Sequence, residues 1–192
     1  TGIMVQDETE KRLAAFYVTP VSRLKLSLGY ILSAWLVGTG MCLLTLAAGE
    51  GYFALRGYGL LKAGSVLKLG GMIALNTFVF ATIAYLFALS VHNSSAWSGL
   101  LTIVGTLVGF VGGIYLPMDS LSAPVQSALK CLPVLHGASM MREVCTEETI
   151  VEAFAGMPQG AGEIFREAMG ISVMAGEHKF SPGEQVLILL LY

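Results

Sequence analysis

Charged side chains are scarce in this sequence of 192 residues, where Asp, Glu, Lys and Arg together make up 12%. A soluble domain carries about 25%, because charges must cover its exterior. The shortage, together with a hydrophobic share of 55%, is typical of helices that face lipid. Three cysteines are too few for a disulfide scaffold, and a net charge of −2 excludes a nucleic-acid binder. The composition therefore indicates an integral membrane protein.

Motifs for catalysis and for nucleotide or metal binding are also absent. The sequence has no G-x-x-x-x-G-K-[ST] loop, no G-x-G-x-x-G turn, no H-E-x-x-H and no Cys/His ligand spacing. Its three histidines, His92, His136 and His178, lie in no recognisable nucleophile motif. We therefore expect no catalytic residues, no metal site and no cofactor in this chain. An intramembrane hydrolase is a formal alternative.

Two long stretches without any charge define the expected membrane spans. Leu26–Gly49 is uncharged, and so is Leu69–Met118. A bilayer core of about 30 Å takes about 20 residues of helix, so the second stretch is long enough for two spans. The polar turn at 92–95 divides it. We expect helices, because backbone groups in lipid must be hydrogen-bonded within the chain, at about residues 26–48, 69–91 and 96–118.

Both ends of the sequence look cut. A fourth apolar run, Val186–Tyr192, stops after a few residues, and the chain opens with Thr1 rather than Met. We therefore expect an internal piece of a longer protein. The predicted fold class is all-α: a polytopic membrane helix bundle with three full spans, re-entrant helices and a small helical insertion. Its expected divisions are a partial transmembrane domain over 1–136, the insertion over 137–185 and a truncated final span over 186–192.

Residues 5–23 form the first candidate functional segment. Leu13, Phe16 and Tyr17 recur at helical spacing beside a charged stretch, and Pro20 ends the pattern, since the residue before proline avoids the helical region. An amphipathic helix over 5–19 could lie on lipid headgroups or dock on a soluble protein partner. Its three acids and two bases favour the protein partner, because membrane-surface helices are usually plainly basic.

Small and polar residues mark expected helix contacts within the spans. Gly105, Gly109 and Gly113 recur every fourth residue, a spacing that lets helices approach closely. Packing within the bundle is the favoured interpretation, and lining a substrate path is the alternative. Asn76 is the costliest polar residue in a span and is expected to face protein rather than lipid. No ionisable residue lies within a span, which argues against a proton- or ion-coupled transporter.

Three prolines, Pro117, Pro124 and Pro133, follow the third expected span. They forbid one continuous helix and predict a re-entrant hairpin of two short helices over 119–136. Beyond it we expect two soluble helices, Ser139–Phe154 and Gly162–Met169. For Cys131 and Cys145, a disulfide and two free thiols are both open.

Two segments together resemble the membrane subunit of ABC-2 type (type V) ATP-driven exporters. The first is Glu10–Arg23, which reads E-K-R-L-A-A-F-Y-V-T-P-V-S-R. The second runs from Phe110 to Leu121, F-V-G-G-I-Y-L-P-M-D-S-L, and continues to L-P-V-L-H at 132–136. Their order, and their separation by three expected spans, make the resemblance specific over about residues 1–140. The insertion over 137–182 is larger than the usual external connection of this family.

The resemblance implies a permease subunit that is not itself an enzyme and holds no cofactor, because ATP is bound by a partner ABC ATPase. It also implies a second permease subunit, identical or different, in the lipid bilayer. Residues 1–25 would be cytoplasmic and 119–185 external, whereas charge alone leaves the orientation open at four bases against three. The residues implied for ATPase docking are Glu10, Leu13, Phe16, Pro20 and Arg23. Those implied for the re-entrant cap are Pro117, Pro124 and Pro133.

The substrate is not readable from these residues, since drugs, peptides, lipids, glycans and ions all fit a mainly apolar path. The alternative function is a non-transporting integral membrane scaffold whose external acidic region binds a partner.

Overall fold

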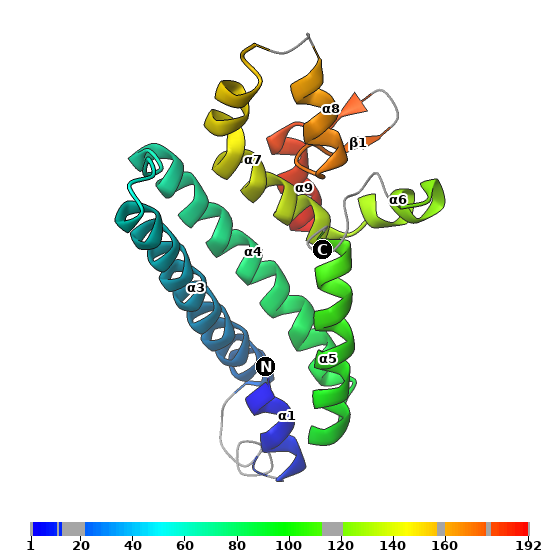
Figure 1. Ribbon diagram of the computed structural model, residues 1–192. Coiled ribbons are helices and arrows are strands. Elements are labelled where there is room, and N and C mark those ends of the chain that lie inside the picture. Colours follow the sequence, from blue (N-terminus) through cyan, green and yellow to red (C-terminus); the bar gives the residue numbers. More distant parts are fainter. Residues whose placement is uncertain are drawn as a thin grey trace. The chain divides into compact units, whose positions relative to one another are not determined.

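The computed structural model describes residues 2–10, 12, 22–112, 121–156, 160–175 and 178–191, and this part of the chain is almost entirely helical (Figure 1). Two strands of two residues each form a small antiparallel hairpin. Because all the other elements are helices, the all-α fold class is confirmed. In chain order the elements are α1 (Gly2–Thr9), α3 (Arg23–Leu55), α4 (Ala63–Leu89), α5 (Ser94–Val111), α6 (Ala123–Lys130), α7 (Pro133–Ala153), α8 (Ala161–Ala168), β1 (Met174–Ala175), β2 (His178–Lys179) and α9 (Pro182–Leu191).

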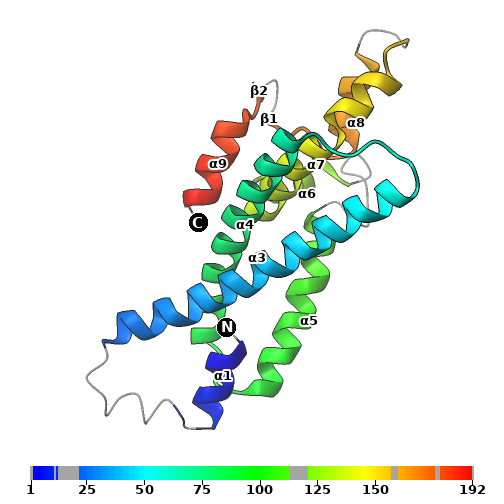
Figure 2. The same cartoon turned by 90° about the vertical axis from the view of Figure 1, so that its left-hand side faces the viewer.

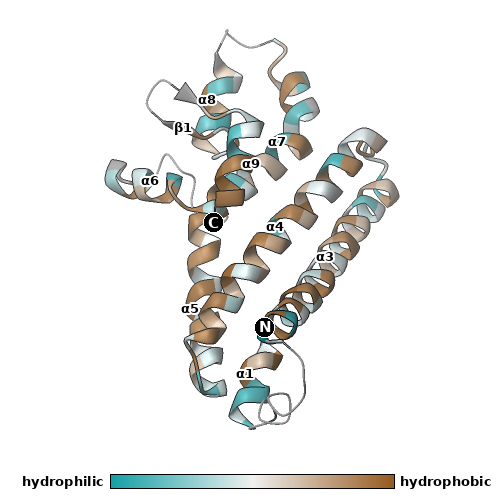
Figure 3. Cartoon of the chain, turned by 180° about the vertical axis from the view of Figure 1, so that it is seen from behind, coloured by the Kyte–Doolittle hydropathy of each residue, from teal (hydrophilic) through white to brown (hydrophobic). Residues whose placement is uncertain are grey.

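Three helices, α3, α4 and α5, are long and apolar enough to cross a membrane. Figure 3 shows them mainly in the colour of hydrophobic residues, whereas α8 mixes hydrophilic and hydrophobic residues. The prediction of three spans in a polytopic helix bundle is confirmed.

The ends of these helices differ from the expected ones. α3 has 33 residues and is therefore about 50 Å long, against a hydrocarbon core of about 30 Å. It includes Arg23, Lys25 and Glu50, because a charge marks where lipid contact ends but does not stop a helix. α5 ends earlier than expected, at Val111. Residues 113–120, with Gly113 and Pro117, lie outside the described residues.

The end of α3 carries a group of aromatic residues. The ring of Phe53 lies 6.0 Å from that of Tyr52 and 6.2 Å from that of Tyr58, both edge-to-face. The Arg56 guanidinium lies over the Tyr52 ring at 5.5 Å. Aromatic and basic side chains of this kind are enriched where a span leaves the hydrocarbon core. We call Tyr52, Phe53, Arg56 and Tyr58 the aromatic end of α3.

The described chain forms two compact units. The first unit contains Thr1–Leu60 and Ile73–Val104, and the second contains Leu61–Met72 and Gly105–Tyr192.

In the first unit, α3 and the part of α4 from Ile73 to Leu89 run in opposite directions, side by side in Figure 1 and crossing at an angle in Figure 2. Interhelical hydrogen bonds help hold helices together in lipid, because lipid tails are as apolar as the helices and supply no hydrophobic driving force for their association. Tyr85 Oη donates to Ser27 Oγ at 2.7 Å, Trp35 Nε1 donates to the Ala74 carbonyl at 2.8 Å, and the hydroxyls of Thr39 and Thr77 are 2.7 Å apart.

In the second unit, α7 is one continuous helix of 21 residues. We expected a boundary at 136/137, between the re-entrant hairpin and the insertion, but Gly137 lies inside the helix. A glycine there costs only about 1 kcal/mol relative to alanine, which the buried face of α7 offsets. Pro124 and Pro133 lie in the first turns of α6 and α7, where a missing N–H breaks no helical hydrogen bond.

α9 begins with a capping box, which the sequence analysis does not predict. The backbone N–H of Ser181 donates to Glu184 Oε2 at 2.7 Å, and the backbone N–H of Glu184 donates to Ser181 Oγ at 3.3 Å. The run S-P-G-E supplies the reciprocal pair and a proline at the first helical position. α9 therefore begins at Pro182 rather than at the expected Val186.

Candidate docking and coupling sites

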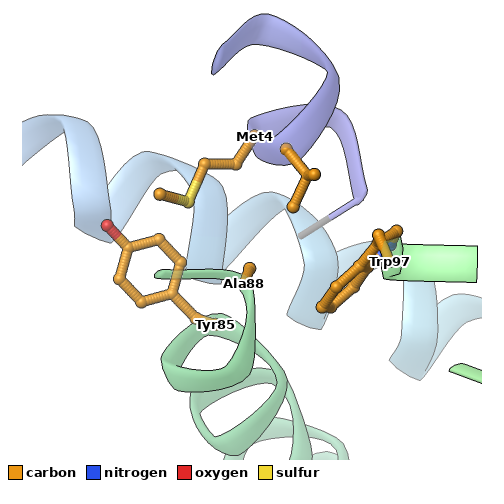
Figure 4. Packing of buried hydrophobic residues seen from close by; sticks show 5 residues of the cluster. Met4, Tyr85, Ala88 and Trp97 are labelled. Carbon is orange, nitrogen blue, oxygen red and sulfur yellow. The ribbon is translucent and has the colours of Figure 1, made fainter. Parts of the chain in front are cut away.

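α1 is held in the first unit by two buried side chains, Met4 and Val5. Val5 is fully buried and Met4 is 7% exposed. They pack with Tyr85 and Ala88 of α4 and with Trp97 of α5 (Figure 4). α1 also comes close to α5 at Gly2, where a Cβ atom would lie 3.1 Å from Trp97 Nε1. We call Met4, Val5, Tyr85, Ala88 and Trp97 the anchor cluster.

Polar contacts extend this attachment over the last turn of α1. Tyr30 Oη, from α3, donates to Asp7 Oδ2 at 2.7 Å. In the turn between α4 and α5, His92 Nε2 lies 3.6 Å from Glu8 Oε1. Ser94 Oγ, at the start of α5, donates to Thr9 Oγ1 at 3.4 Å. α1 therefore contacts all three membrane-spanning helices of the described chain.

The predicted docking residues begin where α1 ends. Glu10 and Arg12 lie in turns, so the single helix expected over 5–19 is interrupted. The Glu10 carboxylate accepts a hydrogen bond from Gln6 Nε2 at 2.9 Å and lies 2.5 Å from Arg12 Nη2. These side chains are exposed, and exposed ion pairs contribute little stability. Arg23 is the first residue of α3.

The other predicted site residues are distributed as follows. Leu13, Phe16 and Pro20 lie outside the described residues, and their docking role stays a prediction. Asn76 is 4% exposed within α4, so its side chain faces protein. Gly109 is buried, whereas a Cβ atom at Gly105 would meet no atom of the described chain within 4 Å. The packing role of Gly105 within the bundle stays a prediction.

Arg142, on α7 in the second unit, is a site residue that we did not predict. Its Nη2 donates to the carbonyl of Gly112, directly after α5, at 2.5 Å. Its Nη1 donates to the carbonyl of Met169, directly after α8, at 3.3 Å. Partial burial lowers the pKa of this guanidinium, which nevertheless stays charged at neutral pH. The available sequence signal was a basic residue seven positions after Leu135 and three after Ser139, both of which are buried on the same helix face.

Together these features define a multi-pass membrane protein with a helical insertion after its third described span. The comparison with protein families identifies the kind. The chain matches the family described as ABC-2 family transporter protein over residues 1–189. It therefore belongs to that family and is a membrane component of a transporter, as the two sequence motifs suggested. Searches of curated proteins and of solved structures found no match.

Proposed function

We propose that this chain is the permease subunit of an ATP-binding-cassette exporter, driven by separate ATPase subunits that bind ATP. Membership of the ABC-2 family supports a role in transport. The attachment of α1 is the observation that supports coupling to an ATPase. α1 contacts α3, α4 and α5, and it leads directly into residues 10–23, which we call the docking segment. A force applied to that segment reaches the ends of three spans at once.

The first unit supplies the parts that would respond. Three hydrogen bonds join α3 to α4, so the two helices would move together. No residue of α3 is fully buried, and large apolar side chains such as Leu36, Val37 and Leu44 are exposed. This surface is therefore available to lipid and to a second permease subunit. ATP-driven closure of the ATPase pair would push the docking segment and expose the path between the spans to each side in turn.

The orientation belongs to the same proposal. Residues 1–25 would lie in the cytoplasm, where the ATPase is found, and 119–185 outside the cell. Three spans lie between these two segments in the sequence, so the segments would face opposite sides of the membrane.

Labelling of a natural cysteine tests this orientation. Cys145 is an exposed cysteine on α7. In the full-length protein with every other cysteine replaced, we expect a membrane-impermeant maleimide to label Cys145 nearly completely in intact cells. Arg12→Cys in a cysteine-free background, also exposed, should be labelled only after the cells are permeabilised. Protection of Cys145 in intact cells, with labelling after permeabilisation, would reverse the proposed topology.

Disruption of the docking residues tests the proposed partner. We expect the triple variant Glu10→Arg, Phe16→Asp and Arg23→Glu to lower the amount of ATPase that co-purifies with the full-length permease by about 30-fold or more, because each lost interface anchor costs about 2 kcal/mol or more. The measurement is the ratio of the two subunits after affinity purification from membranes.

The matched control makes the same kinds of change on the insertion: Glu147→Arg, Ile164→Asp and Arg166→Glu. Ile164 is 71% exposed, so this variant should fold and keep its ATPase. An unchanged subunit ratio in the docking variant would refute docking through residues 5–23.

A further inference from the structure

Side chains of α7 cap the C-terminal carbonyls of three other helices in the second unit. His136 Nε2 bonds the carbonyl of Lys130, the last residue of α6, at 2.8 Å. Arg142 donates to the carbonyl of Gly112 after α5 and to that of Met169 after α8. The last carbonyls of a helix have no partner within the helix and carry its negative dipole end. α7 therefore supplies partners to three helix ends at once.

Residues 169–173, which follow α8, are attached along α7 by hydrogen bonds and packing. Arg142 bonds the carbonyl of Met169, and the buried Ser139 hydroxyl donates to the carbonyl of Ile171 at 2.6 Å. Leu135 packs against Val173. Every second residue of 169–173 thus meets successive turns of α7 in the reverse order.

The same attachment continues to α9. The backbone N–H of Phe180 donates to the carbonyl of Val173 at 3.0 Å, and the Phe180 ring meets the His136 ring edge-to-face at 5.5 Å. Gln185 Nε2, on α9, donates to the carbonyl of Phe180 at 3.3 Å. The start of α9 is therefore attached to residues 169–173, which pack on α7.

We propose that Arg142 is a positioning residue that links the end of the α5 span to the insertion, so that a shift of α5 is passed through α7 to α8 and α9. Gly112 and Met169 are far apart in the sequence, and one guanidinium joins them. Its two separate NH₂ groups suit this task, whereas a lysine ammonium offers one point charge. Among the side chains that the structure describes, no carboxylate forms an ion pair with Arg142.

The test uses hydrogen–deuterium exchange on the full-length permease, purified with its ATPase in lipid nanodiscs. Without nucleotide, we expect Arg142→Met to speed amide exchange in residues 105–112 and in 165–173 by about tenfold to a hundredfold, as for the loss of hydrogen bonds to a charged group. Arg142→Lys keeps the charge and should fall between this variant and the wild type. The control is Arg166→Met, which removes the same charge from the insertion and should change neither segment.

A non-hydrolysable ATP analogue then tests the coupling, which rests on the proposed function. In the wild type we expect the analogue to change exchange in 165–173, and in Arg142→Met that change should vanish while the change at the α1 end persists. Equal exchange of both segments in Arg142→Met and Arg166→Met would refute the link. If the nucleotide still changes exchange in 165–173 in Arg142→Met, Arg142 has only a structural role and the proposed coupling is refuted. Loss of the ATPase from wild-type preparations would instead count against the proposed function, since the nucleotide-free comparison needs no ATPase.

Discussion

Val5→Asp is expected to detach α1 from the spans that it contacts. Val5 is fully buried between α4 and α5 in the anchor cluster. Burying an ionised carboxylate without a partner costs several kcal/mol even after the protein relaxes. We therefore expect amide exchange over residues 2–9 to accelerate by about a hundredfold or more, as measured on the full-length protein in nanodiscs. The ATPase that co-purifies should fall as well, because the docking segment would lose its fixed position.

Gln6→Asp is the matched control for this substitution. It introduces the same carboxylate on the next residue of α1, where the side chain is exposed. Its cost should be a few tenths of a kcal/mol, from the repulsion of Glu10 one turn away. Equal exchange of α1 in the two variants would mean that the anchor cluster does not hold this helix in the membrane-embedded protein.

Leu135→Ala is expected to destabilise the second unit by about 2–5 kcal/mol, the usual cost of a large-to-small change in a core. Leu135 is 1% exposed and packs with Val173, while Leu121, Leu129 and Phe180 surround the pair. The cavity would weaken the contacts of residues 169–173 with α7 and the attachment of the start of α9. Protease cleavage within the insertion of the full-length permease reports this opening, and we expect it to be about 30-fold faster or more.

Leu132→Ala provides the comparison for Leu135→Ala. Leu132 is 39% exposed and precedes α7, so the same atoms are removed without opening a cavity. A cleavage rate close to that of the wild type is expected. Similar rates for the two variants would show that the cluster around Leu135 is not what keeps the insertion closed.

The sequence predicted the number and type of the spans because lipid imposes a simple requirement: a run of uncharged residues long enough to cross it. It predicted their ends less well. α3 continues past Glu50 and α4 begins before Lys68, since helices persist in the headgroup region, where charged side chains reach water. Gly137 misled us in α7 because tertiary packing outweighs a small local propensity.

The candidate sites were only partly predictable. The spacing of apolar residues beside a charged stretch indicated the docking segment. Its two outer residues are Glu10, directly after α1, and Arg23, at the start of α3. The roles of Val5 and Arg142 depend on contacts with residues far away in the sequence, such as Trp97 and Gly112. No periodicity in α1 or α7 encodes those distances. The capping box at Ser181 was readable, because its spacing is a local signal.

The length of α3 has a consequence for how the protein sits in its bilayer. Its uncharged run, Leu26–Gly49, is about 36 Å long and exceeds a core of about 30 Å. Such a positive hydrophobic mismatch is relieved by tilting or by local thickening of the lipid. The aromatic end fixes the depth of one terminus, so the tilt moves the other terminus sideways, where Tyr30 meets α1. Bilayer thickness would thereby act on the same contacts as the proposed ATPase.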